Sequence, residues 1–190
     1  DLYFSVKNNK WSNPTNLGEH INSRFSDKQP CFSADGKYLY FVSNRPGGLG
    51  GLDIWKTKIE YSDFGVVKFS NPENLGSTIN TSYDEMSPFI HPDNLTFYFS
   101  SRGHLGMGDY DLYISRRSNS EEKWVDVKNL GFPINTFKVE NSLIVASNGK
   151  TAYYASDQSG YGKEDIFYFE LPKQLQANEI LELEMDIITN

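Results

Sequence analysis

The chain has 190 residues, enough for one ordinary domain, and 15% of them are aromatic, so Tyr, Phe and Trp are expected to form much of the core. Its formal net charge of −7 argues against a protein that binds the nucleic-acid backbone or an anionic membrane surface. Cys31 is the only cysteine, which excludes an intrachain disulfide and a cysteine-based metal site.

Short strands separated by turns are expected along the whole chain, because 15 Gly and 8 Pro punctuate short apolar runs. The clearest example lies between residues 33 and 55. Asp35-Gly36 is a strong hairpin signal, and the aromatic and β-branched run Tyr38–Val42 that follows it is typical of a buried strand. The glycine-rich residues Pro46–Gly51 then predict a loop, and an alternating strand is expected to begin at Asp53.

This order of features is repeated, with Asp-aliphatic-aromatic triplets that begin at Asp1, Asp53, Asp111 and Asp165, at spacings of 52, 58 and 54 residues. Each unit holds four short strands, here called A to D in chain order, and four strands in a period of about 40–50 residues are the signature of a β-propeller blade. The sequence therefore predicts an all-β propeller of four-stranded antiparallel blades, of which about three and a half are present. Large aromatic side chains are expected to fill the spaces between blades, namely those of Trp11, Tyr40, Trp55, Phe97, Trp124 and Tyr153.

Residues 1–172 are expected to form these blades, as the C-terminal part of a larger propeller, because propellers typically close with about 4–8 blades. The remaining blades are expected before Asp1, so the chain is interpreted as a piece of a longer protein. Leu171-Pro172 ends the last repeat, since proline cannot continue a central strand. Residues 173–190 are expected to form a linker and an exit strand, Ile180–Ile187, which either closes the last blade or leads to a following domain.

The repeat resembles a known family. The residues Ser33-Ala34-Asp35-Gly36-Lys37, the strand ending in Ser43-Asn44-Arg45, the glycine loop and Asp53-Ile54-Trp55 look like the TolB-like, WD-repeat-like β-propeller repeat. The run Tyr168–Lys173 is similar to the propeller exit of Bacteroidetes envelope proteins of the OmpA family. This resemblance implies a periplasmic scaffold associated with the outer membrane, with the type IX secretion and gliding machinery as one branch. In that family peptidoglycan is bound by an OmpA-like domain, so the resemblance assigns peptidoglycan binding to none of the residues of this chain.

The repeated turn and loop residues are interpreted as architectural. An Asp that opens a strand after a glycine-rich loop can accept hydrogen bonds from the N–H groups of that loop, and a residue that recurs in every blade is a poor candidate for catalysis. The alternative is a ligand or cation site in each blade. The residues interpreted as architectural are Asp35, Gly36, Asp53, Asp111 and Asp165.

The loops between strands B and C are expected to share one face of the propeller with the connections from strand D to the next strand A. Loops gathered on one face of a rigid scaffold are the usual place for binding, so this loop face is the candidate partner surface. The glycine-rich loops lead into strands and not into a helix N-terminus, which argues against phosphate binding. The candidate partner-binding residues are Arg45, Arg102, His104, Tyr110 and Tyr161, although Gln158 stands in the third repeat where Arg45 and Arg102 stand in the others.

Three carboxylates, those of Asp27, Glu85 and Glu140, align just before strand A, the innermost strand of a blade. They are candidates for a ring at the mouth of the central channel that binds a cation or a basic partner. The alternative is that each pairs with an arginine or a backbone N–H of a neighbouring blade.

Catalysis is not expected. The three histidines occupy different kinds of position, none is paired with another ligand at metal spacing, and no Gly-x-Ser-x-Gly motif is present. No cofactor and no metal are therefore expected. The favoured function is a non-catalytic scaffold that docks another envelope protein through the loop face, without binding nucleic acid or inserting into a membrane. The alternatives are recognition of a glycan or a peptidoglycan fragment and, less favoured, a glycoside hydrolase or lyase built on a propeller.

Overall fold

The computed structural model describes residues 1–7, 9–61, 67–120, 122–158, 160 and 162–181. In this part of the chain every regular element except one short 3₁₀ helix, η1 (Lys173–Leu175), is a β-strand, and no helix is long and apolar enough to cross a membrane. The strands are β1 (Tyr3–Phe4), β2 (Thr15–Asn16), β3 (Asp27–Phe32), β4 (Tyr38–Ser43), β5 (Asp53–Tyr61), β6 (Val67–Phe69), β7 (Glu73–Asn74), β8 (Glu85–Ile90), β9 (Thr96–Ser101), β10 (Asp111–Arg116), β11 (Val125–Asn129), β12 (Glu140–Val145), β13 (Thr151–Ser156) and β14 (Asp165–Glu170).

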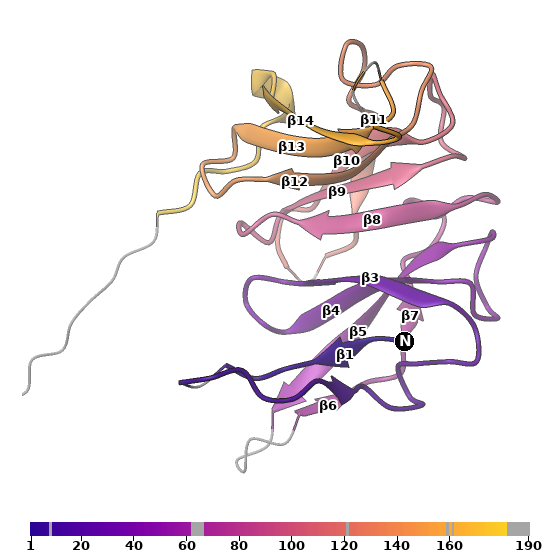
Figure 1. Ribbon diagram of the computed structural model, residues 1–190, viewed down its shortest axis with the longest axis vertical. Coiled ribbons are helices and arrows are strands. Elements are labelled where there is room, and N and C mark those ends of the chain that lie inside the picture. The colour runs from indigo at the N-terminus through magenta and orange to yellow at the C-terminus, as the bar shows by residue number, and fades with distance from the viewer. Residues whose placement is uncertain (8, 62–66, 121, 159, 161, 182–190) are drawn as a thin grey trace, which may run out of the picture.

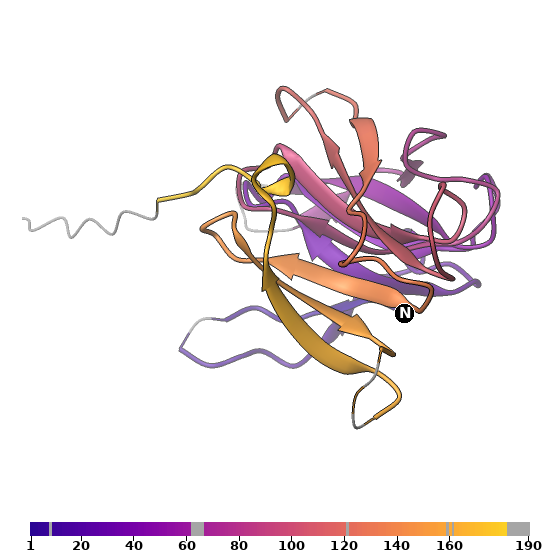
Figure 2. The ribbon, with the colours of Figure 1, turned by 90° about the horizontal axis from the view of Figure 1, so that it is seen from above.

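The strands form antiparallel sheets that follow one another along the chain and stack face to face (Figures 1 and 2). β1 and β2 pair as a partial blade. The first complete blade has the order β3-β4-β5, and β6 and β7 both pair with β5, so its strand D is divided into two pieces. The second blade has the order β8-β9-β10-β11, and the third has β12-β13-β14. This arrangement confirms the all-β propeller architecture with antiparallel blades.

The third blade differs because no described residue forms its strand D. After β14 the chain passes across the turn end of the sheets, where Arg116 Nη2 donates to the carbonyls of Gln174 (3.1 Å) and Gln176 (2.9 Å). The N–H of Ile180 then donates to the carbonyl of Ser147, in the turn between β12 and β13. Most of the expected exit strand, residues 182–187, lies outside the described residues.

The core is divided into three clusters, each between neighbouring sheets. Tyr40, Trp55, Phe97 and Trp124 are buried there, as the sequence predicts. For Trp11 and Tyr153 that prediction is wrong, since 67% of Trp11 and 41% of Tyr153 is exposed. Tyr153 belongs to the last sheet, whose outer face no other described sheet covers, and Trp11 lies beyond the paired residues of the first sheet, in an isolated bridge with Lys7.

One asparagine in each connection between blades fastens that connection to strand C. Asn80 Oδ1 accepts the N–H of Ile54 (2.8 Å), while its Nδ2 donates to the Ile54 carbonyl (2.9 Å) and to Asn74 Oδ1 (2.9 Å). Asn22 and Asn135 make the same three bonds in their repeats. All three asparagines are buried, and the amide suits this place because one planar group supplies both an acceptor and two donors.

The substitution Asn80→Ala is expected to lower the free energy of unfolding by about 1–3 kcal/mol, because it leaves the buried N–H of Ile54 without a partner and removes one of the two donors to the Ile54 carbonyl, which keeps the N–H of Leu75. Urea unfolding of the purified chain measures this loss. The control is Asn71→Ala, since Asn71 is exposed and its loss is expected to change stability by less than about 0.5 kcal/mol. Equal losses in the two variants would contradict the role assigned to Asn80.

Candidate functional site: the loop face

The B–C loops and the D–A connections pack against one another at one end of the strands. The N–H of Gly51 donates to the carbonyl of Tyr83 (3.0 Å). Glycine is required beside it, because a Cβ on Gly50 would lie 2.1 Å from the same carbonyl oxygen. Gly108 stands in the same relation to the carbonyl of Lys138 in the second blade (2.2 Å). The described residues of these loops and connections are what we call the loop face, namely residues 17–26, 44–52, 75–84, 102–110, 130–139, 157–158, 160 and 162–164.

The repeated aspartates at the start of strand C close the glycine-rich loops. Asp53 Oδ2 accepts the N–H of Leu49 (2.6 Å), and Asp111 Oδ2 accepts that of Met107 (2.6 Å). Asp165 repeats the arrangement in the third blade. The other carboxylate oxygens of Asp53 and Asp111 are buried without a hydrogen-bond partner among the described residues. In that part of the chain no three or more His, Cys, Asp or Glu side chains gather where a metal ion could be held.

The hairpin turn between strands A and B has a similar internal structure. Asp35 Oδ1 accepts the hydroxyl of Ser33 (2.7 Å) and the N–H of Lys37 (3.1 Å). Gly36 has φ +69°, a left-handed conformation that favours glycine. Asp35 and Gly36 therefore stabilise the conformation of the turn.

Arg45, expected on the loop face as a partner-binding residue, is an internal side chain of which 11% is exposed. Its Nη2 donates to Asp27 Oδ1 (2.6 Å) and to the carbonyl of Ile21 (2.5 Å). The guanidinium also lies over the rings of Phe41 (4.8 Å) and Trp55 (5.5 Å). Arginine suits this place because its planar group forms an ion pair, a carbonyl bond and ring contacts at once. Because its guanidinium is engaged by these internal contacts, Arg45 is not available to bind a partner at the surface.

His104 makes the equivalent contact in the second blade. Its Nε2 lies 2.8 Å from the carbonyl oxygen of Ile79, the counterpart of the Ile21 carbonyl that Arg45 binds. The ring packs against Phe99 (5.7 Å between centroids) and Tyr113 (5.2 Å). His104 is therefore half-buried and holds the connection between blades.

Arg102 and Tyr110 remain at the surface of the loop face. Arg102 Nη2 pairs with Asp109 Oδ1 (2.7 Å), and its guanidinium lies 5.3 Å from the centroid of the Tyr110 ring. The Tyr110 hydroxyl donates to Asp84 Oδ2 (3.2 Å). Burial, with the nearby charge of Asp84, raises the pKa of Tyr110 to about 12, so the hydroxyl stays protonated at neutral pH. Tyr161 lies outside the described residues.

The carboxylates of Asp27, Glu85 and Glu140 begin the innermost strands β3, β8 and β12, but all three are buried. Glu85 accepts the N–H and the hydroxyl of Thr81 (both 2.7 Å), and Glu140 accepts those of Thr136 (3.0 and 2.6 Å). Each carboxylate accepts hydrogen bonds from a serine or threonine four residues before it, and Asp27 also pairs with Arg45 of its own blade. They do not form a solvent-facing ring, because they are buried. They also do not rely on an arginine of a neighbouring blade, because the connection that leads into strand A supplies donors to them.

The pKa shifts at this position have opposite signs in the first two complete blades. At Asp27 burial raises the pKa, but hydrogen bonds from Arg45 and from two serines outweigh burial, so the pKa lies below its usual value. At Glu85 burial outweighs the hydrogen bonds from Thr81 and Ser101, so the pKa is raised. Among the hydrogen bonds that lower the pKa of Asp27, the one from Arg45 of the same blade contributes most.

Sequence reasoning missed the exposed apolar side chains of the loop face. Leu105 is 96% exposed and Phe137 is 79% exposed. A signal was available, because an apolar residue among glycines in a loop has no strand to bury it. These residues, which we call the apolar loop residues, are Leu49, Tyr83, Leu105, Met107, Phe132 and Phe137.

No family model and no curated protein matches the chain. Among solved structures it is similar to TolB from Acinetobacter baumannii, with a TM-score of 0.54 and 15% identity over 90% of this chain and 35% of that one. It is also similar to an α-L-arabinofuranosidase from Lactobacillus brevis, with a TM-score of 0.52 and 16% identity over 85% of this chain and 55% of that one. The chain therefore spans 35% and 55% of the lengths of these two structures. At such identities the likeness shows the fold alone, an antiparallel β-propeller of the kind found in TolB.

The substitution Asp27→Asn is expected to lower the free energy of unfolding at pH 7 by about 2–4 kcal/mol, because Arg45 loses its carboxylate inside the protein. The folded-state pKa of Asp27 lies below the unfolded value of about 3.9. Its stabilising contribution is therefore present above about pH 5 and is lost as the pH falls through the folded-state pKa. Urea unfolding at pH 7 and at pH 3 is expected to show a smaller difference from the wild-type chain at pH 3.

The matched control is Asp109→Asn, which breaks the exposed ion pair with Arg102 and is expected to cost less than about 1 kcal/mol. A loss at Asp27 that does not depend on pH would contradict the role given to its charge.

Proposed function

We propose that this chain is part of a non-catalytic protein-interaction scaffold that docks other proteins through the loop face. The observation that carries the proposal is the exposure of the six apolar loop residues on that one face. Exposed large apolar side chains that gather on one surface mark interaction sites more often than they mark ordinary surface.

The apolar loop residues project from segments held in place by the chain. Met107 lies in a loop whose N–H groups bind the carboxylate of Asp111. Phe137 lies in the connection against which Gly108 packs. Anchors that are already positioned lose little conformational freedom on binding, so their buried area contributes more fully to affinity.

Exposed ion pairs accompany these anchors. Arg102 pairs with Asp109, and Lys138 Nζ lies 4.0 Å from Asp157 Oδ2. An apolar centre with a polar rim is the usual composition of a protein interface. Arg102 and Tyr110 keep a place in the proposal as rim residues.

The environments of the repeated carboxylates support a non-catalytic role. A glycosidase uses two carboxyl groups about 5–10 Å apart that both reach the substrate. Asp27, Glu85 and Glu140 are buried, and each is already an acceptor within its own repeat. The likeness to an arabinofuranosidase concerns the fold alone.

We further propose the periplasmic side of a bacterial outer membrane as the place where the scaffold works. What supports this is the resemblance of the repeat to the propellers of Bacteroidetes OmpA-family envelope proteins, together with the fold likeness to TolB. The partners are then envelope proteins, and membership of the type IX secretion branch belongs to the same proposal.

The test compares Leu105→Glu with Leu181→Glu. Both leucines are exposed, at 96% and 81%, but Leu105 is on the loop face and Leu181 follows Ile180, which bonds to the turn at the opposite end of the strands. Cross-linked pull-downs from envelope extract are expected to lose partners with the first variant, since a charge at the anchor opposes burial.

The control variant is expected to retain the wild-type partners. Identical partner sets for the wild-type chain and the Leu105 variant would contradict docking through the loop face. Thermal unfolding of both variants checks that neither loss arises from misfolding.

A further inference from the structure

A cavity of about 410 Å³ lies between the first and second complete blades. One wall comes from Tyr40 of β4 and from the connection that contains Ser77 and Thr78. The other comes from the loop between β10 and β11, where Arg117 and Trp124 stand. Its volume is within the range of roughly 300–1,000 Å³ that is usual for small-molecule sites.

Arg117 is a buried cation without a carboxylate partner among the described residues. Only 7% of the residue is exposed, its Nε donates to the carbonyl of Asn94 (2.8 Å), and its guanidinium lies 4.2 Å from the centroid of the Trp124 ring. Its Nη2 is buried and has no hydrogen-bond partner in the described chain. Buried arginines are normally paired, because an isolated charge is costly to remove from water.

Tyr40 supplies a second donor to the same cavity. The residue is fully buried, and its hydroxyl approaches the guanidinium of Arg117 but makes no well-formed hydrogen bond to any described residue. Burial raises the pKa of Tyr40 to about 12, although the nearby positive charge of Arg117 opposes that rise. The hydroxyl is therefore protonated at neutral pH and can donate.

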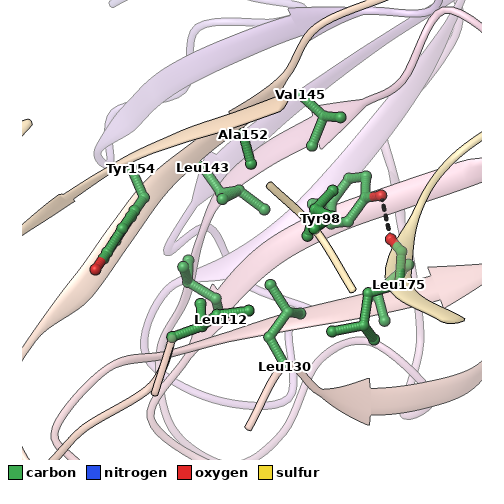
Figure 3. Close-up of a cluster of buried hydrophobic side chains, with 11 residues drawn as sticks. Tyr98, Leu112, Leu130, Leu143, Val145, Ala152, Tyr154 and Leu175 are labelled. Carbon is green, nitrogen blue, oxygen red and sulfur yellow. Dashed lines mark hydrogen bonds between the residues drawn. The ribbon is translucent and has the colours of Figure 1, made fainter. Parts of the chain in front are cut away.

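The next junction along the chain shows how the same position is satisfied elsewhere. Tyr98 occupies in β9 the place that Tyr40 occupies in β4, three residues before the serine that pairs with the first residue of strand C. Its hydroxyl donates to the carbonyl of Leu175 (2.8 Å), as Figure 3 shows. The counterpart of Arg117 in that blade is the apolar Leu171. At this junction the polypeptide supplies the acceptor and no cation is buried.

The remaining charged groups of the cavity do not neutralise Arg117. Lys56 Nζ pairs with Glu73 Oε2 (3.6 Å). Glu122 accepts from Asn119 Nδ2 (2.7 Å) and from the hydroxyl of Ser118. Lys123, which is exposed, adds another positive charge to the wall. The described lining therefore has three cations and two carboxylates that are already engaged.

We propose that this cavity binds a small hydroxylated carboxylic acid, whose carboxylate accepts hydrogen bonds from Arg117 Nη2 and the Tyr40 hydroxyl. Two donors match the two oxygens of a carboxylate, and the guanidinium supplies the countercharge. The net charge of −7 disfavours a dianion such as phosphate. The exposed hydroxyl residues Ser77 and Thr78 suit a ligand with hydroxyl groups of its own. This site is separate from the apolar loop residues and does not depend on the proposed docking function.

The probe is D-glucuronate, titrated calorimetrically into the 190-residue chain in a carboxylate-free, low-salt buffer. D-glucose and inorganic phosphate are titrated in parallel. Saturable binding of glucuronate is expected, with at least tenfold weaker binding of both other compounds. Arg117→Gln is expected to weaken glucuronate binding at least tenfold, because it removes the countercharge.

The discriminating pair of variants is Tyr40→Phe and Tyr98→Phe. The first is expected to weaken binding about fivefold without lowering the unfolding temperature, because the hydroxyl that it removes makes no well-formed hydrogen bond to any described residue and only approaches the guanidinium of Arg117. The second removes a hydroxyl bonded to Leu175, so it is expected to lower the unfolding temperature and to leave binding unchanged.

The proposal is overturned if glucuronate binds no better than glucose, if phosphate binds as tightly, or if Tyr40→Phe leaves the affinity unchanged. The Tyr40 variant keeps the test decisive even if Arg117→Gln does not fold.

Discussion

The side-chain amide of one asparagine in each repeat is the interaction on which the propeller depends. A stack of sheets needs each connection to leave the outer strand at a fixed point and return to the axis. Asn80 fixes that point by bonding the N–H and the carbonyl of Ile54. Its side-chain amide thus makes the hydrogen bonds that the backbone of a neighbouring strand would otherwise make. The next strand A starts within a few residues, at Glu85, which Thr81 of the same connection binds. The position of each blade relative to the last is therefore set locally.

Equivalent positions of the repeats are occupied by side chains of different chemical type. The carboxylate that begins strand A is paired with an arginine at Asp27, whereas Glu85 has the half-buried His104 nearby and a raised pKa. The carbonyl that Arg45 binds in one junction is bound by the ring of His104 in the next. An arginine and a histidine can replace one another here because the position requires only a side chain that binds the backbone carbonyl of the connection between blades. What the repeats share is thus a set of satisfied polar groups, achieved by more than one residue type.

The fold could be predicted from the sequence because hairpin signals, apolar strands and glycine loops act over a few residues and recur with one period. Site residues were harder to predict, because exposure depends on contacts between distant residues. Arg45 sits in a glycine-rich loop yet points inward, since Asp27 and Ile21 lie 18 and 24 residues away in sequence and receive it. Leu105 is apolar yet almost fully exposed. Tyr153 follows the repeat but belongs to a sheet with an uncovered face, and Trp11 lies outside the named strands.

Specificity in such a molecule is to be sought where the repeats differ. Tyr40, Tyr98 and Tyr153 occupy one repeat position, yet one hydroxyl faces a cavity, one binds the chain after β14 and one side chain is partly exposed. The difference follows from the residue one past the end of strand C in the next blade, which is Arg117 at one junction and Leu171 at the other. Where that residue is the apolar Leu171, the chain after β14 supplies the acceptor for the tyrosine hydroxyl of the junction. A buried cation there has no carboxylate partner among the described residues, and because an isolated charge is costly to bury, an anion that reached it would be stabilised.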